Sequence, residues 1–143
     1  MGRQVLSKVF PLLSIVVLLF PMVVFMLASP PLLILKHDTP VDGRFIRGLF
    51  NVYYIIVITI ATAGTAGWAL MGRGVVAFAM GGLVVFVFGL RRWMISNMDK
   101  LRCAMTRGDF MAVPRFRRLH IAGMILNVVQ LGTVAWGMTR LAT

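Results

Sequence analysis

Four long apolar stretches alternate along the chain with short segments that carry most of the charged residues. The apolar stretches cover about 9–29, 50–70, 75–93 and 119–139. A helix needs about 20 predominantly apolar residues to cross the roughly 30 Å hydrocarbon core of a membrane. The pattern therefore predicts an all-α fold, an integral membrane four-helix bundle, with residues 1–143 forming a single transmembrane domain.

Prolines and a short connection mark where these helices bend, end and turn. Pro21 lies inside the first stretch, where the loss of a backbone hydrogen bond is expected to kink the helix, and Pro30 and Pro31 end it. Only residues 71–74 separate the second and third stretches, so these helices are predicted to form a tight antiparallel hairpin.

Polar and aromatic residues open the second stretch. Asn51, Tyr53 and Tyr54 are of the types found where a helix enters the membrane–water boundary. We therefore expect these side chains at the membrane surface.

Small residues are concentrated on both sides of the predicted hairpin. Residues 61–67 are all Ala, Gly or Thr, and Ala77, Ala79, Gly81 and Gly82 follow on the next helix. Small side chains let helix backbones approach closely in lipid. The cluster indicates structural packing or, alternatively, a path for a substrate along the seam.

The third helix is predicted to continue beyond the membrane. Met94, Met98, Leu101 and Met105 recur at spacings of four, three and four residues, with charged residues between them. This spacing indicates an amphipathic cytoplasmic extension of the third helix, lying along the membrane surface and ending near Gly108.

Small and polar residues occupy one face of the fourth helix. His120, Gly123, Asn127, Gln130 and Gly137 fall at helical spacing. Asn127 and Gln130 either hydrogen-bond to neighbouring helices or form a polar pocket for a headgroup or cofactor.

Composition and charge support a membrane protein with a basic surface. Hydrophobic residues make up 59% of the chain, with a mean hydropathy of +0.90, which is more apolar surface than a soluble core of this size buries. The net charge of +11 comes from residues between the apolar stretches. We therefore expect anionic lipid headgroups, and not nucleic acid, as their partner.

The distribution of basic residues predicts the orientation. Four spans place Arg3, Lys8, Arg73 and Arg140 on one side of the membrane and the other eleven of the fifteen basic residues on the opposite side. Because short cytoplasmic loops carry the excess of Lys and Arg, we expect a multi-pass protein of the bacterial inner membrane with both termini outside the cytoplasm.

Residues for catalysis or ion transport are scarce. The four acidic residues, Asp38, Asp42, Asp99 and Asp109, lie outside the predicted spans, and the sequence has no Glu. Proton-coupled transporters, cation channels and hydrolytic membrane enzymes generally use carboxylates within the membrane. The single cysteine, Cys103, forms no metal-binding cysteine motif. We therefore predict that the protein is not an enzyme and has no catalytic residues.

Two histidines form the one candidate cofactor site. His37 follows the first span and His120 opens the fourth, which places both at the cytoplasmic boundary, on helices that are neighbours in a simple bundle. A bis-histidine haem or a metal site is one interpretation, with Cys103 or Asp38 nearby. The alternative is that no cofactor binds and that the histidines are ordinary boundary residues.

Basic and aromatic side chains also alternate near the cytoplasmic boundary. They are suited to hold the protein at the headgroup level or to dock on an acidic surface of a partner protein. The residues concerned are Arg91, Arg92, Trp93, Arg115, Phe116, Arg117 and Arg118.

Two segments resemble a known family. Residues 116–127 (FRRLHIAGMILN) and 48–54 (GLFNVYY) resemble the transmembrane-protein-205-like domain of unknown function, over about residues 21–136. The resemblance implies a four-span architecture without a settled enzymatic activity. It draws attention to His120 and Asn127, whereas Ile121 departs from the family's pattern, in which a basic residue is common. The matching residues are Phe116, Arg118, Leu119, His120 and Asn127.

The sequence thus leads to two functional hypotheses. The first is a non-enzymatic accessory or assembly subunit that packs against a larger membrane protein complex, respiratory or photosynthetic in kind. The alternative is a protein that binds or transports a small solute, a metal or a porphyrin through the polar face of the fourth helix.

Overall fold

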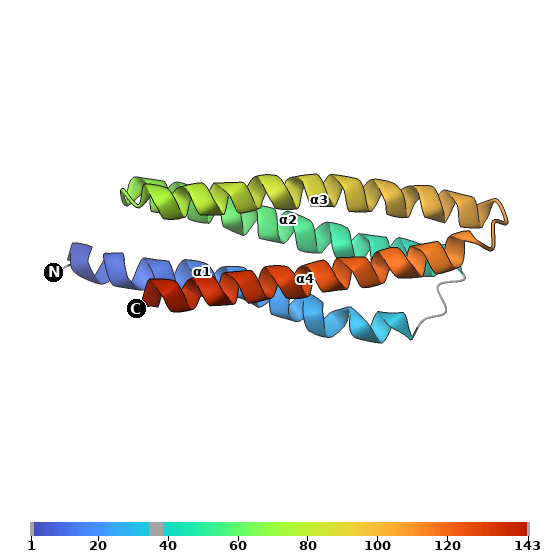
Figure 1. The fold of residues 1–143 in the computed structure, drawn as a ribbon, viewed down its shortest axis with the longest axis horizontal. Helices are drawn as coiled ribbons and strands as arrows, with labels where there is room; N and C mark the ends of the chain where they lie inside the picture. Colours follow the sequence, from blue (N-terminus) through green and yellow to red (C-terminus); the bar gives the residue numbers. More distant parts are fainter. Residues whose placement is uncertain (1, 35–38, 143) are drawn as a thin grey trace.

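The computed structural model describes residues 2–34 and 39–142, which form four long helices packed as a bundle (Figure 1). Each helix contains a segment long and apolar enough to cross a membrane. The prediction of an all-α bundle with four candidate membrane spans is therefore confirmed, and the chain has the character of a multi-pass membrane protein. The helices are α1 (Gly2–Ala28), α2 (Pro40–Leu70), α3 (Gly74–Thr106) and α4 (Ala112–Ala142), with a short 3-10 helix η1 (Pro30–Leu33) after α1.

The two chain ends lie at the same end of the bundle (Figure 1). The connection from α3 to α4 lies at the opposite end, which also carries most of the described basic residues. We call this the basic end. Helices α2 and α3 form the hairpin expected from their short connection. Helix α1 packs on α2, α4 packs on α3, and α1 and α4 also contact each other.

The helix ends follow local sequence signals. The α-helical part of α1 continues through Pro21 and stops at Ala28, directly before the two prolines of η1. Helix α2 begins earlier than the predicted span, because Thr39 caps it: the Thr39 side chain accepts a hydrogen bond from the Asp42 backbone N–H at 3.2 Å. Proline at the start of α2 fits the first helical turn, where no backbone N–H is needed.

The hairpin between α2 and α3 is closed by a glycine and packed by small residues. Gly72 has a φ of 74°, a conformation that glycine adopts without strain. A Cβ added at Gly64 would lie 2.8 Å from Met80 Cε, and one at Gly81 would lie 3.6 Å from Thr65 Cγ2. The close approach of these two helices is thus confirmed.

Helix α3 continues to Thr106 as one unbroken helix, and Gly108 follows with a φ of 87°. The continuation past the predicted span is confirmed, but its apolar stripe does not lie on a membrane surface. Met94 and Met98 have no exposed surface and belong to the core. The reason is that α2 begins at Pro40 and α4 at Ala112, so both helices run beside this part of α3. A Cβ at Gly43 of α2 would lie 3.5 Å from Met105 Cε, and one at Gly123 of α4 would lie 3.2 Å from Met94 Cε.

An aromatic cluster occupies the centre of the bundle. The ring of Phe25 stacks on Tyr53 at a centroid distance of 4.2 Å and meets Phe50 edge-on at 4.8 Å. Tyr53 and Tyr54 are 4% and 1% exposed, so their side chains face the interior of the bundle and not its surface, whereas their depth in the membrane stays a prediction. Because α2 begins at residue 40, Tyr53 lies about 20 Å along that helix, inside the bundle.

Candidate functional site

The polar face of α4 points into the bundle. His120, Asn127 and Gln130 are all buried, as is Gly123 on the same face. The spacing that placed these residues on one face is therefore confirmed. Polar side chains inside a membrane protein need partners, because lipid offers none.

Tyr53 joins the two amides of this face to α2. Its hydroxyl accepts a hydrogen bond from Asn127 Nδ2 at 2.7 Å and donates one to Gln130 Oε1 at 3.0 Å. The three side chains form a buried hydrogen-bonded group that we call the tyrosine–amide cluster. The sequence pattern points to the two amides but not to Tyr53, because tyrosine near the start of a span is typical of the membrane boundary.

The tyrosine–amide cluster retains unused hydrogen-bonding capacity. A phenol carries one hydrogen and so cannot satisfy every atom of two amides. Within the described part of the chain, Asn127 Oδ1 and Gln130 Nε2 are buried and have no hydrogen-bond partner. A buried polar atom left without a partner costs about 1–3 kcal/mol, so these two atoms favour a further polar contact.

His120 connects α4 to the end of α1. Its Nε2 lies 3.1 Å from the Ser29 hydroxyl oxygen, and its ring meets Phe50 edge-on at a centroid distance of 5.5 Å. Both Ser29 and His120 are completely buried. The expected proximity of the first and fourth helices is confirmed at this contact.

The proposed haem or metal site at His37 and His120 remains a prediction. His37 and Asp38 lie outside the described residues, whereas Cys103 is exposed on α3. Among the residues that the structure describes, no group of three or more His, Cys, Asp or Glu side chains is placed to hold a metal ion. An absorption spectrum and a metal analysis of the purified protein test this hypothesis directly.

Gly123 marks the closest approach of α4 to the aromatic cluster. A Cβ at this position would collide with the Phe50 ring, coming within 2.7 Å of Phe50 Cζ, and would lie 3.2 Å from Met94 Cε. Gly123 is thus an internal packing residue that lets α4 approach α2 and α3.

The basic end combines internal ion pairs with exposed cations. Arg47 donates to both carboxylate oxygens of Asp99, at 3.2 and 3.0 Å, and thereby links α2 to α3. Arg91 donates to Asn51 Oδ1 through Nε and Nη2, at 3.2 and 2.8 Å, and makes a second link. The predicted interaction residues that remain exposed at this end are Arg92, Trp93, Arg115, Arg117 and Arg118.

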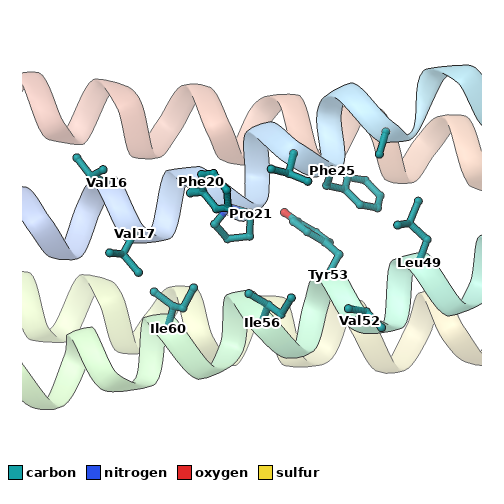
Figure 2. A pocket seen from close by; sticks show the side chains of 12 residues that line it. Val16, Val17, Phe20, Pro21, Phe25, Leu49, Val52, Tyr53, Ile56 and Ile60 are labelled. Carbon is teal, nitrogen blue, oxygen red and sulfur yellow. The ribbon is translucent and has the colours of Figure 1, made fainter.

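Two apolar grooves lie on the sides of the bundle. The first, of about 480 Å³, lies between α1 and α2, with Pro21 and Phe25 on one side and Ile56 on the other (Figure 2). The second, of about 600 Å³, lies between α3 and α4 near the chain ends, and we call it the terminal groove. Gln130 of the tyrosine–amide cluster lines the terminal groove, whereas Tyr53 lines the first.

No protein-family model, curated protein or solved structure matches this chain. The resemblance to the transmembrane-protein-205-like domain therefore stays a prediction.

Proposed function

We propose that this protein is a non-enzymatic accessory or assembly subunit that packs against a larger complex in the membrane. The observation that carries the proposal is an exposed face of α3 suited to another helix. Such a subunit acts by packing and requires no catalytic residues. This role suits a chain that is almost entirely helix.

The exposed face of α3 has the spacing of a helix-packing seam. Its residues follow each other at intervals of three and four, which is the repeat of helices that pack along their length. A Cβ at either glycine of this face would meet nothing within 4 Å. The face consists of Val75, Phe78, Gly82, Val85 and Gly89, all of them exposed.

Burial along α3 supports the same interpretation. Only 11% of its most apolar window is buried, compared with 33% for the windows of α1 and α2. Two glycines separated by seven residues let a partner backbone approach closely, which favours helix association in lipid. A helix of the larger complex is the partner we propose for this face.

The charge of the basic end favours an orientation in which this end faces the cytoplasm. Trp93 lies beside its exposed arginines, and Arg92 and Lys100 of α3, together with Arg107 just after α3, line a shallow depression of about 730 Å³. Such a surface suits anionic headgroups, which favours the cytoplasmic leaflet of a bacterial inner membrane for this end. A respiratory or photosynthetic complex is the kind of partner we propose.

The test is purification from the native membrane in a mild detergent, followed by native electrophoresis and mass spectrometry. We expect a stoichiometric complex of defined composition, and we expect Gly89→Leu to release the protein from it by blocking the close approach of helices. Gly132→Leu is the matched control, because Gly132 is exposed on α4 with nothing within 4 Å of a Cβ.

Two results would overturn the proposal. One is that the wild-type protein runs alone or as a small oligomer of itself in several mild detergents. The other is that Gly89→Leu and Gly132→Leu remain in the complex equally well.

A further inference from the structure

The terminal groove is an apolar space with one amide in its wall. Its volume of about 600 Å³ lies within the range of ligand pockets, roughly 300–1,000 Å³. Besides Gln130, the polar groups of its lining are the Thr133 hydroxyl, which donates to the Val129 carbonyl at 2.8 Å, and two indole rings. The indoles belong to Trp68 and Trp136, and the rest of the lining is apolar or glycine.

Gln130 brings an unused hydrogen-bond donor to this wall. The side chain is 6% exposed, and its Oε1 is already bound to the Tyr53 hydroxyl. Its Nε2 has no partner among the described residues. An amide nitrogen donates and does not accept, so the group it lacks is an oxygen acceptor such as a carbonyl.

Nε2 is covered by neighbouring atoms in this structure. Contact with a molecule in the groove therefore requires the terminal amide of Gln130 to turn. The last torsion of a glutamine side chain is broad, but the turn also displaces Oε1 from the Tyr53 hydroxyl, so the new hydrogen bond to the ligand must offset that loss.

The position of Gln130 along α4 restricts what can reach it. It follows Arg118 by 12 residues, which corresponds to about 18 Å along the helix. With Arg118 at the headgroups, Gln130 lies deep within a hydrocarbon core about 30 Å thick. The ester carbonyls of phospholipids stay near the headgroups, and lipid in the groove is the competing outcome of the binding test.

The lining also restricts the charge of the ligand. The described groove residues include no Lys, Arg or His, so a carboxylate or phosphate at this depth would be buried without a counter-ion. Aromatic side chains at the groove, Trp68, Phe86 and Trp136, provide faces and edges for a flat ring. The lining thus favours a neutral ring compound with a carbonyl oxygen and a hydrocarbon tail.

We propose that the terminal groove binds a lipid-soluble quinone, with one ring carbonyl accepting a hydrogen bond from Gln130 Nε2 and the tail leaving between α3 and α4. A quinone is neutral, carries carbonyl oxygens on a flat ring and partitions into the membrane interior. The groove shares Gly82 with the partner-facing side of α3 but does not include Gly89. Binding is measured on the purified protein without a partner, so its outcome does not decide the accessory role.

The binding test uses tryptophan fluorescence. The chain has three tryptophans, and two of them, Trp68 and Trp136, line the groove. In a Trp93→Phe background the purified protein is titrated with decylubiquinone at a fixed detergent concentration, since a bound quinone quenches nearby indoles. We expect quenching that saturates.

Two variants locate the site. Gln130→Leu removes one neutral hydrogen bond and should raise the Kd about 2- to 12-fold. Ala79→Phe places a ring in the groove from an exposed lining position and should abolish saturable quenching. The matched control is Ala63→Phe, at an exposed position of α2 outside the groove, which should bind like the parent.

The proposal is overturned if quenching rises without saturation, since the groove then holds only detergent or lipid chains. It is also overturned if Gln130→Leu and Ala79→Phe both bind as the parent does. Helicity measured by circular dichroism identifies a variant that fails to fold. If Gln130→Leu does not fold, the binding of quinone to Ala79→Phe, which changes an exposed position, decides the test.

Discussion

Tyr53 takes part in both kinds of contact that hold the interior of the bundle together. Its ring stacks on Phe25 of α1, and its hydroxyl bridges Asn127 and Gln130 of α4. A single residue of α2 thereby contacts two other helices, α1 through an aromatic face and α4 through hydrogen bonds.

Removing the hydroxyl of Tyr53 should therefore destabilise the bundle. Tyr53→Phe keeps the ring and its stacking but leaves both amides without their shared partner. Interhelical hydrogen bonds in membranes are worth about 0.6 kcal/mol on average, and buried atoms without a partner cost about 1–3 kcal/mol, so we expect a loss of about 1–2 kcal/mol.

Denaturant-induced unfolding in detergent measures this change. Tyr54→Phe is the control, since Tyr54 is as buried as Tyr53 but lies outside the tyrosine–amide cluster. Equal stability of the two variants would contradict a structural role for the Tyr53 hydroxyl.

A second single-residue prediction concerns the glycine beneath the Phe50 ring. Gly123→Ala places a methyl group against Phe50 and Met94 and should cost about 1–3 kcal/mol through overpacking. Gly132→Ala, at an open position of the same helix, should be neutral or slightly stabilising because alanine favours helix.

Thermal unfolding of the two alanine variants distinguishes packing from helix propensity. If the Phe50 contact is the cause, Phe50→Leu should recover part of the loss in Gly123→Ala. A Gly123→Ala protein as stable as the Gly132→Ala protein would show that α4 does not approach as closely as described.

At the level of single residues, the sequence revealed the inward face of α4 but not its partners. Asn127 and Gln130 stand out because amides are rare in an apolar helix, and their spacing places them on one face. Tyr53 does not stand out in this way, since its type suits a membrane boundary as well as a core. What places Tyr53 in the core is its contact with Phe25 of α1 and with the two amides of α4, and these contacts depend on the packing of helices far apart in the sequence.

Among the helices, hydropathy predicts the part within the membrane better than the whole element. Hydropathy marks spans at about 50–70 and 119–139, whereas α2 begins at Pro40 and α4 at Ala112. The additional turns contain charged residues that hydropathy excludes from a span. They are helical because Thr39 caps α2 and because buried Ile46 and Phe116 face the core.

The first turns of α2 are joined to the last turns of α3 by polar contacts, and these contacts lead to a prediction. Arg47 and Asp99 form a two-bonded ion pair, and each side chain is about one-third exposed, at 34% and 36%. Asp99→Ala should therefore lower the unfolding free energy by only about 0.2–1 kcal/mol. The effect should shrink at high salt, because ions screen exposed charges.

A double-mutant cycle isolates this pair. The exchange Arg47→Asp with Asp99→Arg should recover part of the stability that either single change loses. Arg102, which lies 3.7 Å from Asp99 through Nη2, makes the recovery incomplete, since it would then face an arginine. Full additivity of the two single changes would show that the pair contributes nothing.

The whole molecule has two chemically different ends. The hairpin of α2 and α3 closes beside the chain ends with small residues and Arg73, whereas the opposite end holds the ion pairs and the exposed arginines (Figure 1). The terminal groove and the open face of α3 lie in the half nearer the chain ends. We therefore propose that the half nearer the chain ends, which faces lipid, binds hydrophobic molecules and a partner helix. The basic end is proposed to contact headgroups through its charges.

This asymmetry predicts the orientation in the membrane. Positively charged segments between spans are retained in the cytoplasm, and each Lys or Arg near an anionic surface contributes about 1 kcal/mol. We therefore expect both termini outside the cytoplasm. A reporter active only in the cytoplasm should be inactive after Thr143 and active when inserted between Gly108 and Asp109, in the connection from α3 to α4. A reporter that is active after Thr143 would contradict this orientation. It would show that the termini are cytoplasmic and that the basic end lies at the outer leaflet.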